Sequence, residues 1–186
     1  MPEFAFQKAS RPGGRRGRSN PGGGLPEGEG SPWPALAGFI GLCLLVGVTA
    51  ATFNAPAMRA WYPTLLRPPG TPPDWLFAPV WTVLHICIGT SAWLVWWRGS
   101  QGRRQRAALG LWGWQLLLNA AWSPAFFGMH SPALGLLVIV PLLVLIGLTI
   151  MAFWRLHRMA ACLLVPYLCW TGYATYLDAG FWWLNR

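Results

Sequence analysis

Five long runs of apolar residues dominate the chain, separated by short segments rich in proline, glycine and arginine. Each run is close to the ~20 residues that a helix needs to cross a hydrocarbon layer about 30 Å thick. None shows the polar and apolar alternation of a membrane-spanning strand. Since helices are the remaining way to satisfy the backbone in lipid, the pattern predicts an all-α membrane protein, a compact bundle of five transmembrane helices at residues 34–53, 77–97, 109–127, 132–154 and 160–184.

The composition agrees with a membrane protein. Apolar residues make up 54% of the 186 residues and charged residues only 10%, whereas about a quarter of a typical soluble domain is charged. The four cysteines lie inside apolar runs without a C-x-x-C pair, so neither a disulfide framework nor a metal site is expected. The chain also lacks paired carboxylates, a Ser–His–Asp set and a Gly-rich phosphate loop, which excludes hydrolytic and phosphoryl-transfer chemistry.

The N-terminal segment and one connection differ from the apolar runs. Residues 1–32 are mainly Gly, Pro, Ser and Arg, a composition that cannot bury a core. We therefore expect a disordered basic tail at 1–32 and a membrane domain at 33–186. The longest connection, residues 54–76, has four prolines between Pro68 and Pro73. These exclude a helix there and predict a stiff, lid-like loop over the mouth of the bundle.

The basic residues lie mainly on one side of the five predicted spans. Three are on the other side, Arg59, Arg67 and Arg186. The positive-inside rule therefore places the N-terminus in the cytoplasm, and topology explains the basic excess without a nucleic-acid partner. The eleven on the cytoplasmic side are Lys8, Arg11, Arg15, Arg16, Arg18, Arg98, Arg103, Arg104, Arg106, Arg155 and Arg158.

Three predicted spans each carry polar and aromatic residues on one face. Such faces either join helices by hydrogen bonds or line an apolar pocket with a few polar anchors, and the spacing leaves both interpretations open. His85, with no second ligand at a suitable spacing, favours a structural role over metal binding. The faces are Trp81, His85, Ile88, Gly89 and Ala92 in the second span, Gln115, Asn119, Trp122, Ser123 and Phe126 in the third, and Tyr167, Trp170, Thr171, Ala174 and Asp178 in the fifth.

Three blocks of sequence form specific motifs. They are Trp61-Tyr62-x-x-Leu65-x-x-Pro68 continued by Pro72-Pro73-x-Trp75-x-Phe77-x-Pro79-Val80-Trp81-Thr82-x-Leu84; Leu118-Asn119-x-x-Trp122-Ser123-Pro124-x-Phe126-Phe127-Gly128; and Leu163-Leu164-Val165-Pro166-Tyr167-Leu168-x-Trp170 with Ala174-Thr175-Tyr176-Leu177. In this order, over about residues 35–185, they resemble the translocator protein family (TspO/MBR, the peripheral benzodiazepine receptor family), and among its members a bacterial one.

The resemblance implies a five-helix homodimer with a pocket beneath the first loop. Family members bind protoporphyrin IX and haem, isoquinoline carboxamides and benzodiazepines, and in some cases sterols. The expected function is therefore a tetrapyrrole-binding protein of the bacterial cell membrane that acts as a receptor, carrier or stress-linked regulator of tetrapyrrole metabolism and requires no cofactor. Two alternatives stay open: enzyme-like, light-dependent degradation of protoporphyrin IX, and a membrane scaffold with a vestigial pocket.

The resemblance also implies a set of site residues. Trp81 and Trp170 resemble the pair tied to porphyrin photochemistry. The sequence departs from the family at Gly70, where many relatives have Trp, at His85, where Tyr is usual, and at Asp178, where Asn is usual. With His85 included, the expected ligand-binding residues are Tyr62, Trp81, His85, Asn119, Trp122, Ser123, Phe126, Trp170 and Ala174.

Two expected partners depend on weaker patterns. A sterol-recognition pattern needs a basic residue within about five positions of an aromatic one, but Tyr176 is followed by no basic residue before Arg186, so sterol binding is doubtful. Close helix approach in a dimer favours small residues four positions apart. Three pairs fit: Ala37 and Gly41, Gly47 and Ala51, and Ala121 and Ala125. The resemblance favours the third.

The charge asymmetry generates a prediction about topology. Single cysteines placed in the 54–76 loop should react with a membrane-impermeant maleimide from outside intact cells, whereas cysteines in the 98–106 loop should react only after the cells are opened. The native cysteines are first replaced by Ser or Ala. The reverse labelling pattern would contradict the predicted orientation.

Overall fold

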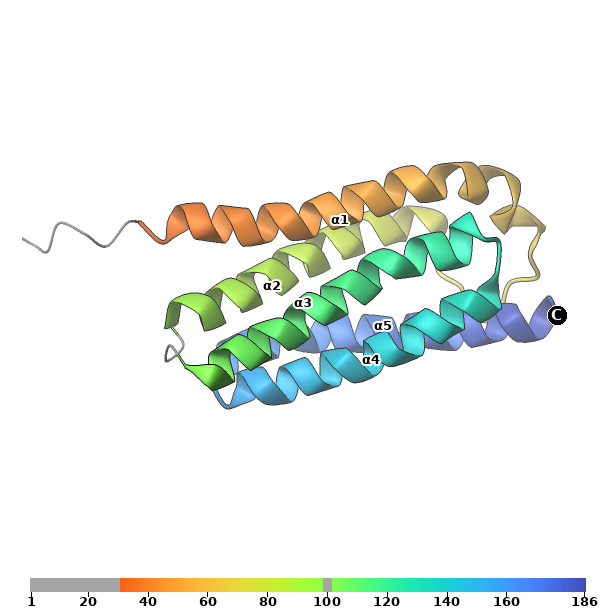
Figure 1. The fold of residues 1–186 in the computed structure, drawn as a ribbon. Helices are drawn as coiled ribbons and strands as arrows, with labels where there is room; N and C mark the ends of the chain where they lie inside the picture. The colour runs from red at the N-terminus through yellow and green to blue at the C-terminus, as the bar shows by residue number, and fades with distance from the viewer. Residues whose placement is uncertain (1–30, 99–101) are drawn as a thin grey trace, which may run out of the picture. The chain divides into compact units, whose positions relative to one another are not determined.

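The structure, a computed structural model, describes residues 31–98 and 102–186. The predicted tail therefore lies almost entirely outside the described residues. Within them every regular element is a helix, and the five long helices confirm the all-α prediction (Figure 1). The helices are α1 (Trp33–Ala60), α2 (Phe77–Arg98), α3 (Arg103–Ser123), α4 (Pro132–Trp154) and α5 (Arg158–Leu184).

The five helices run alongside one another in an order that differs from their order in the chain. α2 packs between α1 and α5, α4 packs against both α5 and α3, and α3 with the turn that follows it returns to α1. The end of α2, the start of α3 and the short α4–α5 connection lie at one end of the bundle, and the long α1–α2 connection lies at the other (Figure 1). This long connection therefore sits beside the C-terminal end of α5.

Four helices, α1, α2 with the turn before it, α4 and α5, are long and apolar enough to cross a membrane. α3 is more polar because it begins with three arginines in four residues and carries Gln115 and Asn119. Its apolar part continues past Ser123 into a π-helical turn, η3 (Pro124–Gly128). The predicted third span at 109–127 thus corresponds to most of α3 and this turn.

Helix α1 continues further than the apolar run predicts. It ends at Ala60, seven residues after Phe53, and includes Pro56. Proline costs a helix one backbone hydrogen bond, but the alanines and methionine around it are strong helix formers. The connection therefore begins at Trp61, not at residue 54, and the extra two turns of α1 extend along the region where the pocket lies.

The core is formed where the helices approach most closely. Tyr167, Ile88, Leu142 and Phe153 are among its largest fully buried side chains. α1 and α2 come into near backbone contact at Gly89, where an added Cβ would lie 2.8 Å from the Cα of Ile40. Since lipid supplies no hydrophobic driving force between helices, such close packing is a main source of their association.

The 61–76 connection is built from turns that its prolines and glycine dictate. Short 3-10 turns, η1 (Tyr62–Thr64) and η2 (Asp74–Leu76), begin and end it. Between them the N–H and the hydroxyl of Thr71 both donate to the carbonyl of Pro68. Gly70 has φ +83°, the left-handed backbone that the third position of a type II turn requires. Glycine therefore suits this position of the turn.

Helix α5 holds this connection in place. The hydroxyls of Tyr173 and Tyr176 donate to the carbonyls of Gly70 and Pro69. The Asn185 side chain accepts from the N–H of Leu66 at 2.8 Å and donates to the Leu66 carbonyl at 3.1 Å. The loop expected as a lid is thus fastened along its length to the last turns of α5.

Matched glycine substitutions test the close contact between α1 and α2. Gly89→Ala should lower the thermal unfolding temperature in detergent, because overpacking costs about 1–3 kcal/mol. Gly147→Ala in α4, where nothing lies within 4 Å of an added Cβ, should be neutral or stabilising by up to about 1 kcal/mol, since Ala favours helix. Equal effects of the two substitutions would contradict the contact.

Candidate functional site: a pocket between α1, α2 and α3

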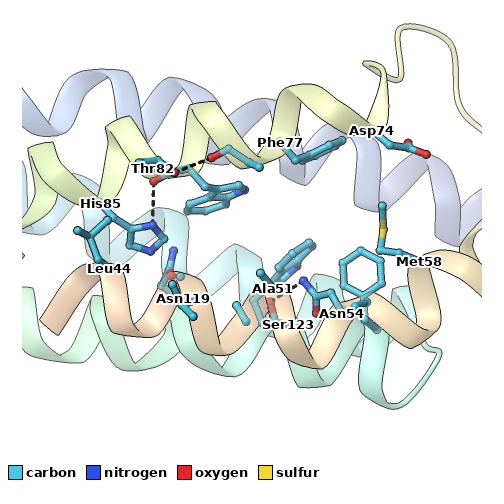
Figure 2. Close-up of a pocket in the computed structure, with 18 of the residues that line it drawn as sticks. Leu44, Ala51, Asn54, Met58, Asp74, Phe77, Thr82, His85, Asn119 and Ser123 are labelled. Carbon is cyan, nitrogen blue, oxygen red and sulfur yellow. Dashed lines mark hydrogen bonds between the residues drawn. The ribbon is translucent and has the colours of Figure 1, made fainter. Parts of the chain in front are cut away.

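A cavity of about 350 Å³ lies between α1, α2 and α3 (Figure 2). Its walls are mainly apolar, and Tyr62 and Asp74 from the 61–76 connection contribute to them. Small-molecule sites are typically apolar clefts of about 300–1,000 Å³ with a few polar groups that orient the ligand. The cavity has this size and character.

The structure brings six of the nine expected site residues to the cavity. Two aromatic rings, Trp81 from α2 and Trp122 from α3, belong to its walls. The other four are polar: Tyr62, His85, Asn119 and Ser123.

The remaining three expected residues lie behind the walls. The Phe126 ring stacks on Trp122 with centroids 5.4 Å apart and is 2% exposed. The Trp170 ring contacts Phe77, which lines the cavity, at a centroid distance of 5.9 Å. Ala174 lines a second cavity of about 10 Å³, which shares walls Trp81, Asn119 and Trp122 with the larger one.

Helix α1 provides a whole side of the cavity that the sequence reasoning missed. The feature of the sequence that indicates this side is a run of small residues at helical spacing, Gly47, Ala51 and Ala55. The first two also form one of the small-residue pairs that favour dimer contact. In the structure this run faces the cavity. The α1 residues that line it are Leu44, Gly47, Val48, Ala50, Ala51, Asn54, Ala55 and Met58.

His85 is held tightly at one end of the cavity. Its Nδ1 lies 2.8 Å from the carbonyl oxygen of Trp81, and because that oxygen can only accept, Nδ1 carries the hydrogen. The imidazole also packs on the Trp81 ring, with centroids 5.4 Å apart. A Cβ on Gly47 would lie 2.9 Å from the imidazole. Glycine at position 47 thus makes room for histidine at position 85.

A row of polar side chains follows from His85 along the cavity (Figure 2). Asn119 donates from Nδ2 to the hydroxyl of Tyr167 on α5 at 2.9 Å. Further along, Asn54 donates from Nδ2 to the hydroxyl of Ser123 at 3.2 Å and so joins α1 to α3. Asn119 and Ser123 therefore have both roles that their spacing left open: they join helices by hydrogen bonds, and they line the pocket.

Trp122 is fixed in the wall by a buried carboxylate. Its indole N–H donates to Oδ2 of Asp178 on α5 at 2.9 Å. Asp178 is 2% exposed. Gly135 on α4 leaves space for this carboxylate, since a Cβ there would lie 3.0 Å from Oδ2. This hydrogen bond between buried groups of α3 and α5 fixes the Trp122 ring in the cavity wall.

The phenol of Tyr62 in the cavity wall suits hydrogen bonding more than proton transfer. Burial raises the pKa of the Tyr62 phenol to about 12, so Tyr62 stays neutral and can donate a hydrogen bond throughout the physiological pH range. Together with the indole rings it gives the site flat apolar surfaces and a few fixed polar contacts.

These features define a helical membrane protein with a deep aromatic pocket inside its bundle. A sequence model described as the TspO/MBR family matches residues 39–184. The chain therefore belongs to the TspO/MBR family.

Several relatives cover most of the chain. "Tryptophan-rich protein TspO" of Chlorobaculum tepidum is 47% identical over 143 residues, which are 77% of this chain and 90% of that protein. "Protein CrtK" of Rhodobacter capsulatus is 37% identical over 145 residues, 77% of this chain and 88% of that protein. "Translocator protein" of Bos taurus is 34% identical over 156 residues, 83% of this chain and 92% of that protein.

A double-mutant cycle tests the bond between Asn119 and Tyr167. Asn119→Leu and Tyr167→Phe should each lower stability by about 1–3 kcal/mol, because each leaves a buried polar partner unpaired. The double variant should be more stable than the sum of the two effects predicts, as measured by unfolding in detergent. Strictly additive losses would contradict the bond.

Proposed function

We propose that this protein is an integral membrane tetrapyrrole-binding protein that acts as a receptor, carrier or regulator in tetrapyrrole metabolism, with protoporphyrin IX or haem as its ligand. The observation that carries the proposal is the pocket itself, where Trp81 and Trp122 stand in walls that also present Asn119 and Ser123. Membership of the TspO/MBR family supports it independently.

The chemistry of the pocket fits a flat macrocycle. Indole rings favour offset stacking on another π system, and the apolar side chains of α1 supply the opposite wall. The polar row described above then offers hydrogen bonds to the polar edge of the ligand. A purely apolar lipid would leave the buried Nε2 of His85 and Oδ1 of Asn54 without a hydrogen-bond partner, which is costly.

The setting that we propose is the cell membrane of a bacterium, with the N-terminus in the cytoplasm and the chain as a homodimer. The apolar helices establish a membrane protein. For the dimer we favour α3, where Gly110 and Gly113 have no neighbour within 4 Å of an added Cβ and Trp114 is 62% exposed. An open small-residue face of this kind allows a second helix to approach closely.

Ligand titration of the purified protein in detergent tests the function. Trp122→Ala and Trp81→Ala should each weaken binding of protoporphyrin IX about three- to thirtyfold, because each removes a stacking surface. Trp96→Ala and Trp183→Ala are the matched controls: these exposed rings lie outside the pocket and should bind like wild type. Wild-type affinity in folded Trp122→Ala and Trp81→Ala would place the ligand elsewhere, and no binding to wild type would favour the vestigial-pocket alternative.

The second candidate function is light-dependent degradation of bound porphyrin. Trp81 in the pocket wall favours it, because a redox-active indole there would contact the excited macrocycle. Trp170 lies one ring further away, behind Phe77. The titrated sample is therefore illuminated and compared with a dark sample and with Trp81→Phe. Loss of porphyrin absorbance that needs both light and Trp81 would establish degradation, and unchanged porphyrin would leave the receptor function alone.

A further inference from the structure

The end of the pocket nearest the 61–76 connection carries a charged pair. Asp74 lines the pocket, and it is the one carboxylate among the described lining residues, which include no Lys or Arg. Its two carboxylate oxygens lie 3.2 and 3.4 Å from the two terminal nitrogens of Arg67. The two planar groups therefore meet in the paired geometry in which arginine binds carboxylates.

Arg67 is also held against a second lining residue. Its guanidinium carbon lies 4.9 Å from the centroid of the Tyr62 ring, within the range of a cation–π contact. The guanidinium thus touches two residues of the pocket wall, from the loop side. Neither of the other two cations at this end shares this position: Arg59 is in the last turn of α1, and Arg186 stacks on Trp183 at 3.6 Å.

The backbone on both sides of Arg67 is fixed. Leu66 exchanges two hydrogen bonds with the side chain of Asn185. Pro68 is buried so closely against α5 that a Cβ on Gly180 would lie 2.6 Å from its ring. Since the residues before and after it are anchored to α5, Arg67 is presented at a defined place beside the pocket.

The partner of Arg67 is exchangeable. The side chains of Arg67 and Asp74 are 39% and 45% exposed, and exposed ion pairs contribute little to stability. A carboxylate that enters the pocket offers the same two oxygens as Asp74. The exchange costs little for the protein, while the pocket buries the rest of the ligand.

We infer that Arg67 is a specificity-determining residue that anchors a carboxylate of the ligand by displacing Asp74, so that the pocket selects flat ligands bearing an acidic group. This inference rests on the proposed function and names the chemistry at one end of the same site. Asp74 then acts as an internal competitor. It binds the guanidinium of Arg67 until the carboxylate of an acidic ligand replaces it, and an Asp74 carboxylate without Arg67 repels that ligand.

The test compares protoporphyrin IX, which has two carboxylates, with its uncharged dimethyl ester. Both are titrated in the dark into protein in nanodiscs of zwitterionic lipid. Wild type should bind the acid about three- to tenfold more tightly than the ester, the range of a partly exposed charge-assisted contact. Arg67→Gln should abolish this preference or reverse it, because Asp74 is then unpaired and repels the acid. Ester affinity should stay unchanged, which also shows that the variant is folded.

Three further variants separate charge from position. Arg67→Lys keeps the charge but loses the two-nitrogen fork, so its acid-to-ester ratio should be intermediate. Asp74→Asn removes the competitor and should strengthen binding of the acid but not of the ester. Arg59→Gln is the matched control. It removes a cation at the same end of the bundle that, unlike Arg67, does not contact Tyr62 and Asp74, so its acid-to-ester ratio should equal that of wild type.

Each outcome decides a different question. A wild-type acid-to-ester ratio in Arg67→Gln, or an equal affinity of wild type for the two porphyrins, would overturn the role of Arg67 while leaving the proposed function standing. Failure of both porphyrins to bind wild type would contradict the proposed function, and this inference with it.

Discussion

The pocket depends on the hydrogen bonds that tie α3 to α5. Asn119 reaches Tyr167, and Trp122 reaches Asp178, each at 2.9 Å. Lipid offers these polar groups no hydrogen-bond partner, so their pairing with α5 determines the rotation and position of α3. α3 also packs on α4. It meets α1 through the Asn54–Ser123 bond and through the rings of Phe39 and Trp112, whose centroids are 5.7 Å apart, and a space lined by small α1 residues lies between the two helices.

Much of this architecture follows from the sequence because hydrocarbon imposes strong rules. Runs of apolar residues identify the helices, and a polar residue such as Asn119 or Ser123 in such a run has to face the interior. Because Asn119 and Ser123 are four residues apart, the sequence predicts that they share one face of α3 with Trp122. Trp81 and His85, also four apart, are predicted to share one face of α2. The pattern of polar residues thus predicts which face of each helix turns toward the bundle interior, and for these residues the structure has the predicted face inside.

Other parts of the site have no such signal. Apart from Asn54, the pocket side of α1 is made of apolar and mostly small residues, and such a surface is equally typical of a lipid-facing or a dimer-forming helix. Whether an aromatic ring lines the cavity or lies one layer behind it, as for Trp122 and Trp170, depends on helix rotations of a few tens of degrees. The pairing of Arg67 with Asp74 depends on a turn at Gly70 and on anchors contributed by α5, more than a hundred residues later in the chain.

The dependence of the 61–76 segment on α5 sets the order in which the pocket is completed during biosynthesis. The segment that completes one end of the pocket, residues 61–76, emerges from the ribosome early, but its fastenings are Tyr173, Tyr176 and Asn185. Until α5 has been made and inserted, this segment lacks these hydrogen bonds, although the rings of Trp61 and Tyr62 at its start can already pack on the turn that follows α3. The nascent chain therefore carries an unfinished pocket until α5 is in the membrane, more than a hundred residues after the segment that α5 holds.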